Sequence, residues 1–195
     1  DLLDSLDKYF SNDEILMLDV NQGWTIEEAY QYLKILENYN FSWIEEPISA
    51  LSNKEEFIKI INATNCNLAF GENITNIDDF IFLSQSPKLK FIQPDLTKYG
   101  GISLLSYLSQ KIQNNKIWMH FLGSGVGLLT SAHVMSAINP NGLLETDINI
   151  NPLRTSIFKN ELNIENGKIH LSDNHGIGGQ LDFDTINEYL VSANT

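Results

Sequence analysis

The chain has 195 residues, enough for one sizeable domain with a hydrophobic core. Its 12 basic and 25 acidic residues give a formal net charge of −13, which repels phosphate backbones and anionic membrane surfaces, and no apolar run approaches the roughly 20 residues that span a bilayer. With one cysteine and no signal-peptide pattern, we expect a cytoplasmic protein that binds neither nucleic acid nor membranes.

Six short apolar runs recur along the chain, and each is followed by an acidic residue or a histidine. Runs of this length, rich in Ile, Leu, Phe and Trp, are typical of buried strands in a parallel sheet. The residues that follow the runs are 23 to 27 positions apart, which leaves room for one helix between successive strands. In chain order the runs occupy residues 15–18, 41–44, 68–71, 91–94, 117–119 and 143–144, and they are followed by Asp19, Glu45, Glu72, Asp95, His120 and Glu145.

The segments between the runs predict amphipathic helices. Two of them begin with capping boxes at residues 25–28 and 52–55, with Thr25 and Ser52 as the N-cap residues. A helix is also expected over residues 1–10. Others are expected after Thr75 or Asn76, after Gly100-Gly101, and from about Gly127 to Ile138. The buried face of the first capped helix is expected to carry Ala29, Tyr30, Leu33, Ile35 and Leu36.

Strand, short loop and helix, repeated at this interval, predict βαβ units and a parallel sheet. A candidate functional group at every strand end favours a (β/α)8 TIM barrel, because an open doubly wound sheet gathers such groups at one switch point. A complete barrel has eight strands in about 250 residues, and this chain supplies six, so we expect strands one and two to lie upstream. Residues 1–156 are then a partial barrel that holds strands three to eight.

Residues 157–195 follow a different pattern and are expected to form an appendage that packs on the barrel. Asn166-Gly167 separates two short apolar segments and is a strong hairpin-turn signal. A short final helix is expected after Asp184.

Asp19, Glu45 and Glu72 end three consecutive predicted strands. Neighbouring strands lie ~4.8 Å apart, so their ends bring three negative groups into one small volume. Unpaired carboxylates would repel one another there, and a hard divalent cation removes that repulsion. Oxygen ligands without Cys or His favour Mg²⁺ over Zn²⁺. The alternative is that the three residues are solvated loop acids. That explanation suits a single acid at a strand end, but it does not explain why acids end three consecutive strands at a regular interval.

Asp95 and His120 end the next two predicted strands, whose adjacent ends permit an Asp–His hydrogen bond. Such a pair orients the imidazole, which can then accept or deliver a proton. The alternative is a histidine that a neighbouring carboxylate satisfies for structural reasons. Glu145, after the sixth run, is a candidate donor to a developing oxyanion or a partner for a cation.

Six motifs, in order and at matching spacing, resemble the mandelate racemase branch of the enolase superfamily, in its C-terminal barrel domain. The resemblance covers about residues 15 to 190. The muconate-lactonizing branch fits less well, because it has a lysine where Asp95 stands and usually an Asp at the position of Glu72. The motifs are Leu18–Trp24, Trp43–Pro47, Gly71–Asn73, Gln93–Gly101, His120-Phe121 and Glu145–Asp147.

The resemblance implies a role for each of these residues. Asp95 and His120 match the general acid/base dyad of the family, Glu145 matches its hydrogen-bond donor to the substrate carboxylate, and Asn21 matches a substrate-proximal position. The metal ligands implied for Mg²⁺ are Asp19, Glu45 and Glu72.

The implied activity is Mg²⁺-dependent abstraction of the α-proton of a small-molecule carboxylate through an enolate, and dehydration of an acid sugar is the first choice. Racemisation or epimerisation of a 2-hydroxy acid or a related acid is the second. The family also carries a lysine on its second strand and an N-terminal capping domain, and neither is visible in this sequence. The third alternative is therefore an incomplete barrel fragment, inactive alone, with a structural or metal-binding role. The resemblance is compatible with a homo-oligomer.

Overall fold

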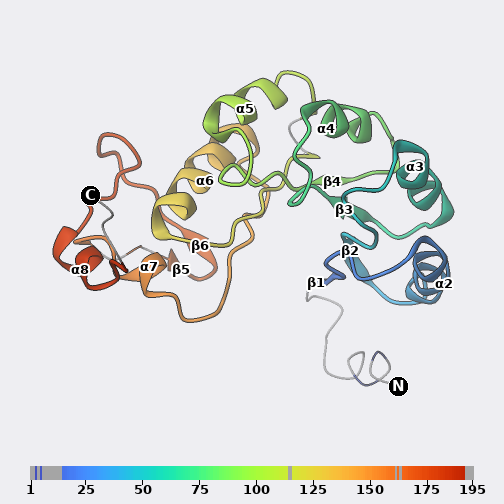
Figure 1. Cartoon of the computed structure of the whole chain (residues 1–195), viewed down its shortest axis with the longest axis horizontal. Coiled ribbons are helices and arrows are strands. Elements are labelled where there is room, and N and C mark those ends of the chain that lie inside the picture. Colours follow the sequence, from blue (N-terminus) through green and yellow to red (C-terminus); the bar gives the residue numbers. More distant parts are fainter. Residues whose placement is uncertain are drawn as a thin grey trace. The chain divides into compact units, whose positions relative to one another are not determined.

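The structure is a computed structural model that describes Leu3, Ser5 and residues 15–113, 116–160, 162 and 164–191 (Figure 1). Apart from Leu3 and Ser5, the helix expected over residues 1–10 lies outside these residues. The chain divides into two compact units, Asp1–Gln93 and Pro94–Thr195. The dividing line therefore falls within the fourth predicted strand run.

The first unit is built on a parallel sheet of four strands in the order β1-β2-β3-β4. Asp19 pairs in register with Glu45, and Glu45 pairs with Ala69. The spatial order follows the sequence order, as expected for consecutive βαβ units, so β1 and β2 deliver their terminal acids to the same edge of the sheet. The strands are β1 (Leu16–Asp19), β2 (Phe41–Glu45), β3 (Leu68–Phe70) and β4 (Phe91–Ile92).

Helices α2 (Ile26–Leu36), α3 (Lys54–Ala63) and α4 (Ile77–Ser84) connect these strands and lie along one side of the sheet (Figure 1). The first capping box is confirmed, because Thr25 accepts from the N–H of Glu28 and the Glu28 carboxylate accepts from the N–H of Thr25. The second lies one residue later than predicted, with Asn53 as N-cap and Glu56 as its partner. Asn caps a helix as well as Ser does, so the choice between neighbouring candidates depends on where the chain leaves the sheet.

The core of the first unit lies between the sheet and these helices. Ile44, Leu68, Phe70 and Ile92 share one face of the sheet by register and are buried. Phe57 of α3 meets Phe70 edge-on, with ring centroids 5.1 Å apart. The other face of β2 therefore carries Trp43 and Glu45, because side chains alternate along a strand.

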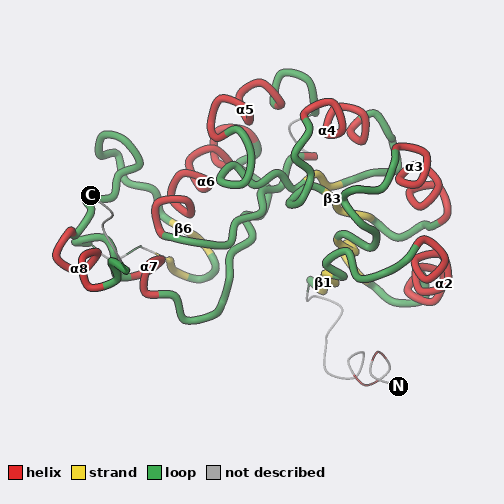
Figure 2. The backbone as a smooth tube through the Cα atoms, viewed as in Figure 1, coloured by secondary structure: helices red, strands yellow, loops and turns green. Residues whose placement is uncertain are grey.

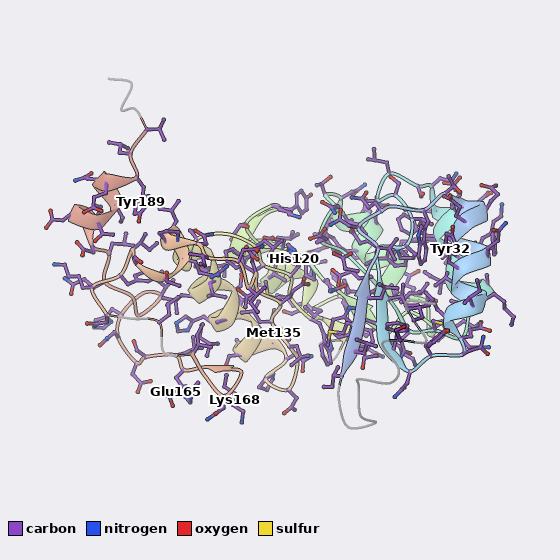
Figure 3. All side chains as sticks on the ribbon, turned by 90° about the horizontal axis from the view of Figure 1, so that it is seen from below. Tyr32, His120, Met135, Glu165, Lys168 and Tyr189 are labelled. Atoms are coloured by element: carbon purple, nitrogen blue, oxygen red, sulfur yellow. The ribbon has the colours of Figure 1, made fainter. Side chains whose placement is uncertain are left out.

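The buried face of α2 is narrower than the sequence predicts. Tyr30 is 41% exposed and Ile35 is 51% exposed, whereas Ala29, Leu33 and Leu36 are buried. The buried residues follow a spacing of four and three, which forms a narrow stripe, and a step of one residue turns a side chain about 100° away from it. Tyr32 of α2 (Figure 3) is 40% exposed, and the centroid of its ring lies 5.0 Å from that of Trp24.

The second unit contains α5 (Gly101–Leu108), α6 (Gly125–Ile138) and α7 (Pro152–Thr155), joined by long loops (Figure 2). Helix α6 begins two residues before the predicted start. Met119 and Leu144 form a parallel β-bridge, and the N–H of Glu145 donates to the carbonyl oxygen of Met119 at 2.9 Å. The fifth and sixth apolar runs therefore lie side by side and parallel.

The predicted hairpin is confirmed as β5 (Ile164–Glu165) paired with β6 (Lys168–Ile169). Asn166 and Gly167 have φ values of 51° and 71°, as a type I′ turn requires. The register partners Glu165 and Lys168 extend from this hairpin (Figure 3). Helix α8 (Phe183–Glu188) begins before Asp184, contrary to the prediction, because the side chain of Asp182 caps it.

The C-terminal segment packs on α6 around Leu129, Ile157 and Phe158. Contacts of this kind are expected of an appendage, and the boundary between residues 156 and 157 stays a prediction. In the part of the chain that the structure describes, no helix has the length and apolar character needed to cross a bilayer. The partly buried residues of this cluster are Leu162, Ile169, Leu171, Ile177, Leu181 and Ile186.

Candidate active site

The carboxyl ends of β1 and β2 carry the first two predicted metal ligands. Asp19 is exposed and Glu45 is 4% exposed. The N–H of Val20 donates to the carbonyl oxygen of Glu45 at 3.0 Å, which continues the ladder past Asp19. Trp43 lies on the same face of β2 as Glu45, and its indole N–H donates to Oε2 of Glu45 at 3.1 Å. The Glu45 carboxylate is thus oriented by its own strand.

Glu72, the third predicted ligand, lies two residues beyond β3 and is 6% exposed. Gly71 precedes it with a φ of 153°, and a Cβ atom at Gly71 would lie 2.6 Å from the backbone nitrogen of Gln93. Only glycine fits this close approach between the end of β3 and the neighbouring chain. The backbone that leads from β3 to Glu72 is therefore held close to the backbone of Gln93.

A second buried carboxylate, Glu46, follows Glu45; the sequence analysis included it in the motif Trp43–Pro47 but gave it no role. It is 1% exposed and has a φ of 38°. Burial, the largest cause, raises the pKa of the Glu46 carboxyl above its usual value, and the charges of Glu72 and Asp19 raise this pKa further, while hydrogen bonds from Asn73 oppose the rise. Asp19 and Glu72 therefore both interact electrostatically with Glu46. The left-handed φ of Glu46 interrupts the alternation of the strand, so the Glu-Glu doublet by itself does not predict this placement.

The chemistry of these positions fits Mg²⁺, which prefers oxygen ligands and few protein carboxylates. Asp19 and Glu45 are register partners, and Glu72 lies two residues beyond the end of the next strand. Among the residues that the structure describes, no three Asp, Glu, His or Cys side chains converge closely enough to form a metal-binding group. The assignment of Asp19, Glu45 and Glu72 as ligands therefore stays a prediction.

Asp95 and His120 are in direct contact in the second unit. Nδ1 of His120 lies 2.9 Å from Oδ2 of Asp95, and both side chains are 1% exposed. Oδ1 of Asp95 accepts from the N–H and the hydroxyl of Thr97, at 2.7 and 2.6 Å, and from the N–H of Lys98 at 3.2 Å. Every oxygen of the Asp95 carboxylate thus has a donor.

These contacts determine the tautomer of His120. Burial by itself raises the pKa of the Asp95 carboxyl, but hydrogen bonds from His120 and Thr97 outweigh it and hold the pKa below its usual value. Asp95 is therefore ionised at neutral pH and can only accept, so Nδ1 of His120 carries the proton that it donates. Proton transfer by this ring would use Nε2.

Glu145 and Asn21 are the remaining predicted site residues. Glu145 directly follows the bridge between Leu144 and Met119, so it lies beside the strand end that carries His120. Asn21 is exposed, has a φ of 47°, and donates its backbone N–H to Oδ1 of Asp19 at 2.7 Å. The roles predicted for both residues stay predictions.

Helix α7 links the loops that follow His120 and Glu145, a feature that the sequence analysis did not find. Arg154, 8% exposed, donates to the carbonyl oxygen of Asn149 and pairs with Asp147 at 3.6 Å. The amide of Asn151 donates to the carbonyl oxygen of Gly123 at 3.2 Å. One short helix thus contacts both loops next to predicted catalytic residues.

A family model described as enolase C-terminal domain-like matches residues 2–185. The chain belongs to this family. The solved relatives of this enolase C-terminal domain-like chain are TIM-barrel proteins of the enolase superfamily, and the chain covers their C-terminal barrel domain. The predicted fold class is confirmed, as is the resemblance to the mandelate racemase branch.

Individual relatives span about twice the length of this chain or more. The L-talarate/galactarate dehydratase of Salmonella typhimurium is 30% identical over 165 residues, which are 84% of this chain and 39% of that protein. A mandelate racemase/muconate lactonizing enzyme from Bordetella bronchiseptica RB50 is 30% identical with a TM-score of 0.82, covering 95% of this chain and 53% of that one. An enolase from Pantoea ananatis with bound d-gluconate and Mg has a TM-score of 0.82 at 19% identity, covering 96% and 46%.

Proposed function

We propose that the whole protein removes the α-proton of a sugar acid with the help of Mg²⁺ and eliminates water from it. The observation that carries the proposal is the buried hydrogen bond of 2.9 Å between Asp95 and Nδ1 of His120. It orients the imidazole so that proton transfer to or from the substrate would use Nε2 of His120. The dehydratase of Salmonella typhimurium, at 30% identity, supports the choice of acid sugars as the substrate class.

The metal would be held by Asp19, Glu45 and Glu72. A bound Mg²⁺ would lower the cost of the negative charge that develops on the substrate carboxylate as the α-proton leaves. A protonated Glu145 would donate to the same carboxylate, and Asn21 would contact the substrate near Asp19. The Mg in the Pantoea ananatis structure supports the choice of metal.

His120 would act at the carbon–oxygen bond. A base takes the α-proton, and the resemblance implies that this base is the lysine on the second strand of the whole protein. The electron pair of the broken bond moves toward the carboxylate and then expels the neighbouring hydroxyl. Nε2 of His120 delivers a proton to that hydroxyl, which leaves as water. Asp95 stabilises the positive charge that the imidazole carries before it donates.

Racemisation is the second candidate, because the same Nε2 could return a proton to the α-carbon. The experiment incubates the whole protein with Mg²⁺ in deuterium oxide and a panel of aldonic and aldaric acids, followed by proton NMR. Formation of a 2-keto-3-deoxy acid supports dehydration, and deuterium at the α-carbon with no loss of water supports racemisation or epimerisation. Failure to form either product with every acid would overturn both enzyme functions and favour the incomplete barrel with a metal-binding role.

A further inference from the structure

Asn73 links two buried carboxylates that belong to different strand ends. Its side-chain Nδ2 donates to Oε2 of Glu46 and to Oε1 of Glu72, each at 2.7 Å. An amide nitrogen carries two hydrogens, so one group serves both carboxylates. The oxygens that accept from it are therefore held close to one another, in two residues that are nearly excluded from water.

Glu46, the anchor of this arrangement, is itself held by backbone bonds. Its φ of 38° lies in the left-handed region, which is costly for a residue with a side chain and persists only where neighbours enforce it. The N–H of Gln22 donates to the carbonyl oxygen of Glu46 at 2.7 Å, and the N–H of Glu46 donates to Ala69 at 3.0 Å. Oε1 of Glu46 also accepts from the backbone N–H of Asn73 at 3.2 Å.

The same contacts tie the loops after β1, β2 and β3 to one another. Gln22 belongs to the loop after Asp19, and its side-chain oxygen accepts from the N–H of Ala50 in the loop after Glu45. Asn73 belongs to the loop after β3 and reaches Glu46 in the loop after β2. Each predicted metal ligand thus has a residue near it in sequence that contacts an adjacent loop.

We propose that Asn73 is a positioning residue that holds Glu72 in place for a divalent metal ion, with Glu46 as its anchor. The inference rests on the proposed function, since it assigns Glu72 to the metal. Groups that orient a metal ligand in this way change metal affinity by about tenfold to a hundredfold when they are removed. Glu46 does not need to touch the ion for this role.

The test measures binding of Mg²⁺, and of Mn²⁺ as a paramagnetic probe, to the full 195-residue chain by calorimetry and electron paramagnetic resonance. Asn73→Leu keeps the approximate volume and removes the donors, and we expect its metal Kd to rise by about tenfold to a hundredfold. The control is Asn67→Leu, because Asn67 is also half-buried and also donates through Nδ2, to Ser42 at 3.0 Å, but lies before β3. Its Kd should stay within twofold of the wild-type value.

A double-mutant cycle tests the anchor. If Asn73 acts through Glu46, the loss of affinity in the Asn73→Leu, Glu46→Gln double variant is smaller than the sum of the single losses, and additive losses would overturn the anchoring role. Asn73→Ser, which keeps one donor, is measured in parallel so that the result does not depend on the stability of one variant. Wild-type binding together with an unchanged Kd in Asn73→Leu and Asn73→Ser overturns this inference alone. A wild-type chain that binds neither ion overturns the metal assignment and this inference together.

Discussion

Asp95 accepts a hydrogen bond of 2.9 Å from Nδ1 of His120, and both side chains are 1% exposed. Because the other oxygen of Asp95 is occupied by Thr97 and Lys98, the carboxylate cannot turn away from the imidazole. The ring is therefore held in one orientation and one tautomer. This contact is the most direct structural support for proton chemistry in the chain.

Replacing Asp95 by Asn should stop most proton transfer without loss of the fold. An amide at position 95 can donate to Nδ1 and so stabilises the wrong tautomer, and we expect the rate to fall by about 10²–10⁴-fold. Formation of the 2-keto-3-deoxy acid, measured by NMR on the whole protein, checks this. Mg²⁺ affinity should be unchanged, since the predicted ligands lie in the other unit. A variant that forms the product at the wild-type rate would exclude the dyad.

The stability of the chain should depend on pH through Asp95. Its pKa is lower in the folded chain than in the unfolded one, so the ionised form stabilises the fold above the unfolded value of about 3.9. This contribution is lost as the pH falls through the lower, folded-state pKa. Urea unfolding of the wild type and of Asp95→Asn should show a gap in the free energy of unfolding at pH 6 that closes in acid. A gap that stays constant down to pH 2.5 would contradict the assignment.

Arg154 should be a stability determinant of the second unit. Arg154→Met leaves the carbonyl oxygen of Asn149 without this donor and the Asp147 carboxylate without its ion-pair partner, and we expect a loss of about 1.5–3 kcal/mol in the free energy of unfolding. Chemical denaturation measures the change. The matched control is Lys159→Met, whose side chain is exposed, and it should change stability by less than about 0.5 kcal/mol. Equal effects of the two substitutions would show that the Arg154 contacts contribute little.

Gly71→Ala should destabilise the first unit more than an ordinary left-handed glycine substitution does. The new Cβ would lie 2.6 Å from the nitrogen of Gln93, and we expect a cost of about 1–3 kcal/mol beyond the backbone strain. Gly101→Ala separates the cost of backbone strain from the cost of the steric clash, because Gly101 has a φ of 60° but no atom within 4 Å of its Cβ position. Thermal unfolding of both variants gives the difference. Similar melting temperatures would mean that β3 and β4 shift apart at little cost.

Much of the first unit follows from the sequence alone. The interval between apolar runs predicted parallel strands in sequence order, and the pairing of Asp19 with Glu45 follows directly from that interval. The contact between Asp95 and His120 was also expected from adjacent strand ends. Periodic features of this kind are local, so the sequence carries them without knowledge of the loops.

The missed features depend on loop geometry that no period encodes. Glu46 and Asn73 meet only because Glu46 adopts a left-handed backbone, and nothing in the Glu-Glu-Pro sequence requires it. Arg154 reaches Asn149 across a turn whose path is set by tertiary packing. The capping box at Asn53 shows the same limit on a smaller scale, because Ser52 and Asn53 are equally good caps by type.

The two compact units separate the predicted chemistry as well as the chain. The acids at positions 19, 45 and 72 all fall before residue 93, and the groups at 95, 120 and 145 all fall after it. The predicted metal ligands and the predicted acid/base groups thus belong to separate halves of the polypeptide. Substitutions in residues 94–195 could therefore change the proton chemistry, while the carboxylates in residues 1–93 keep their predicted role in binding the cation.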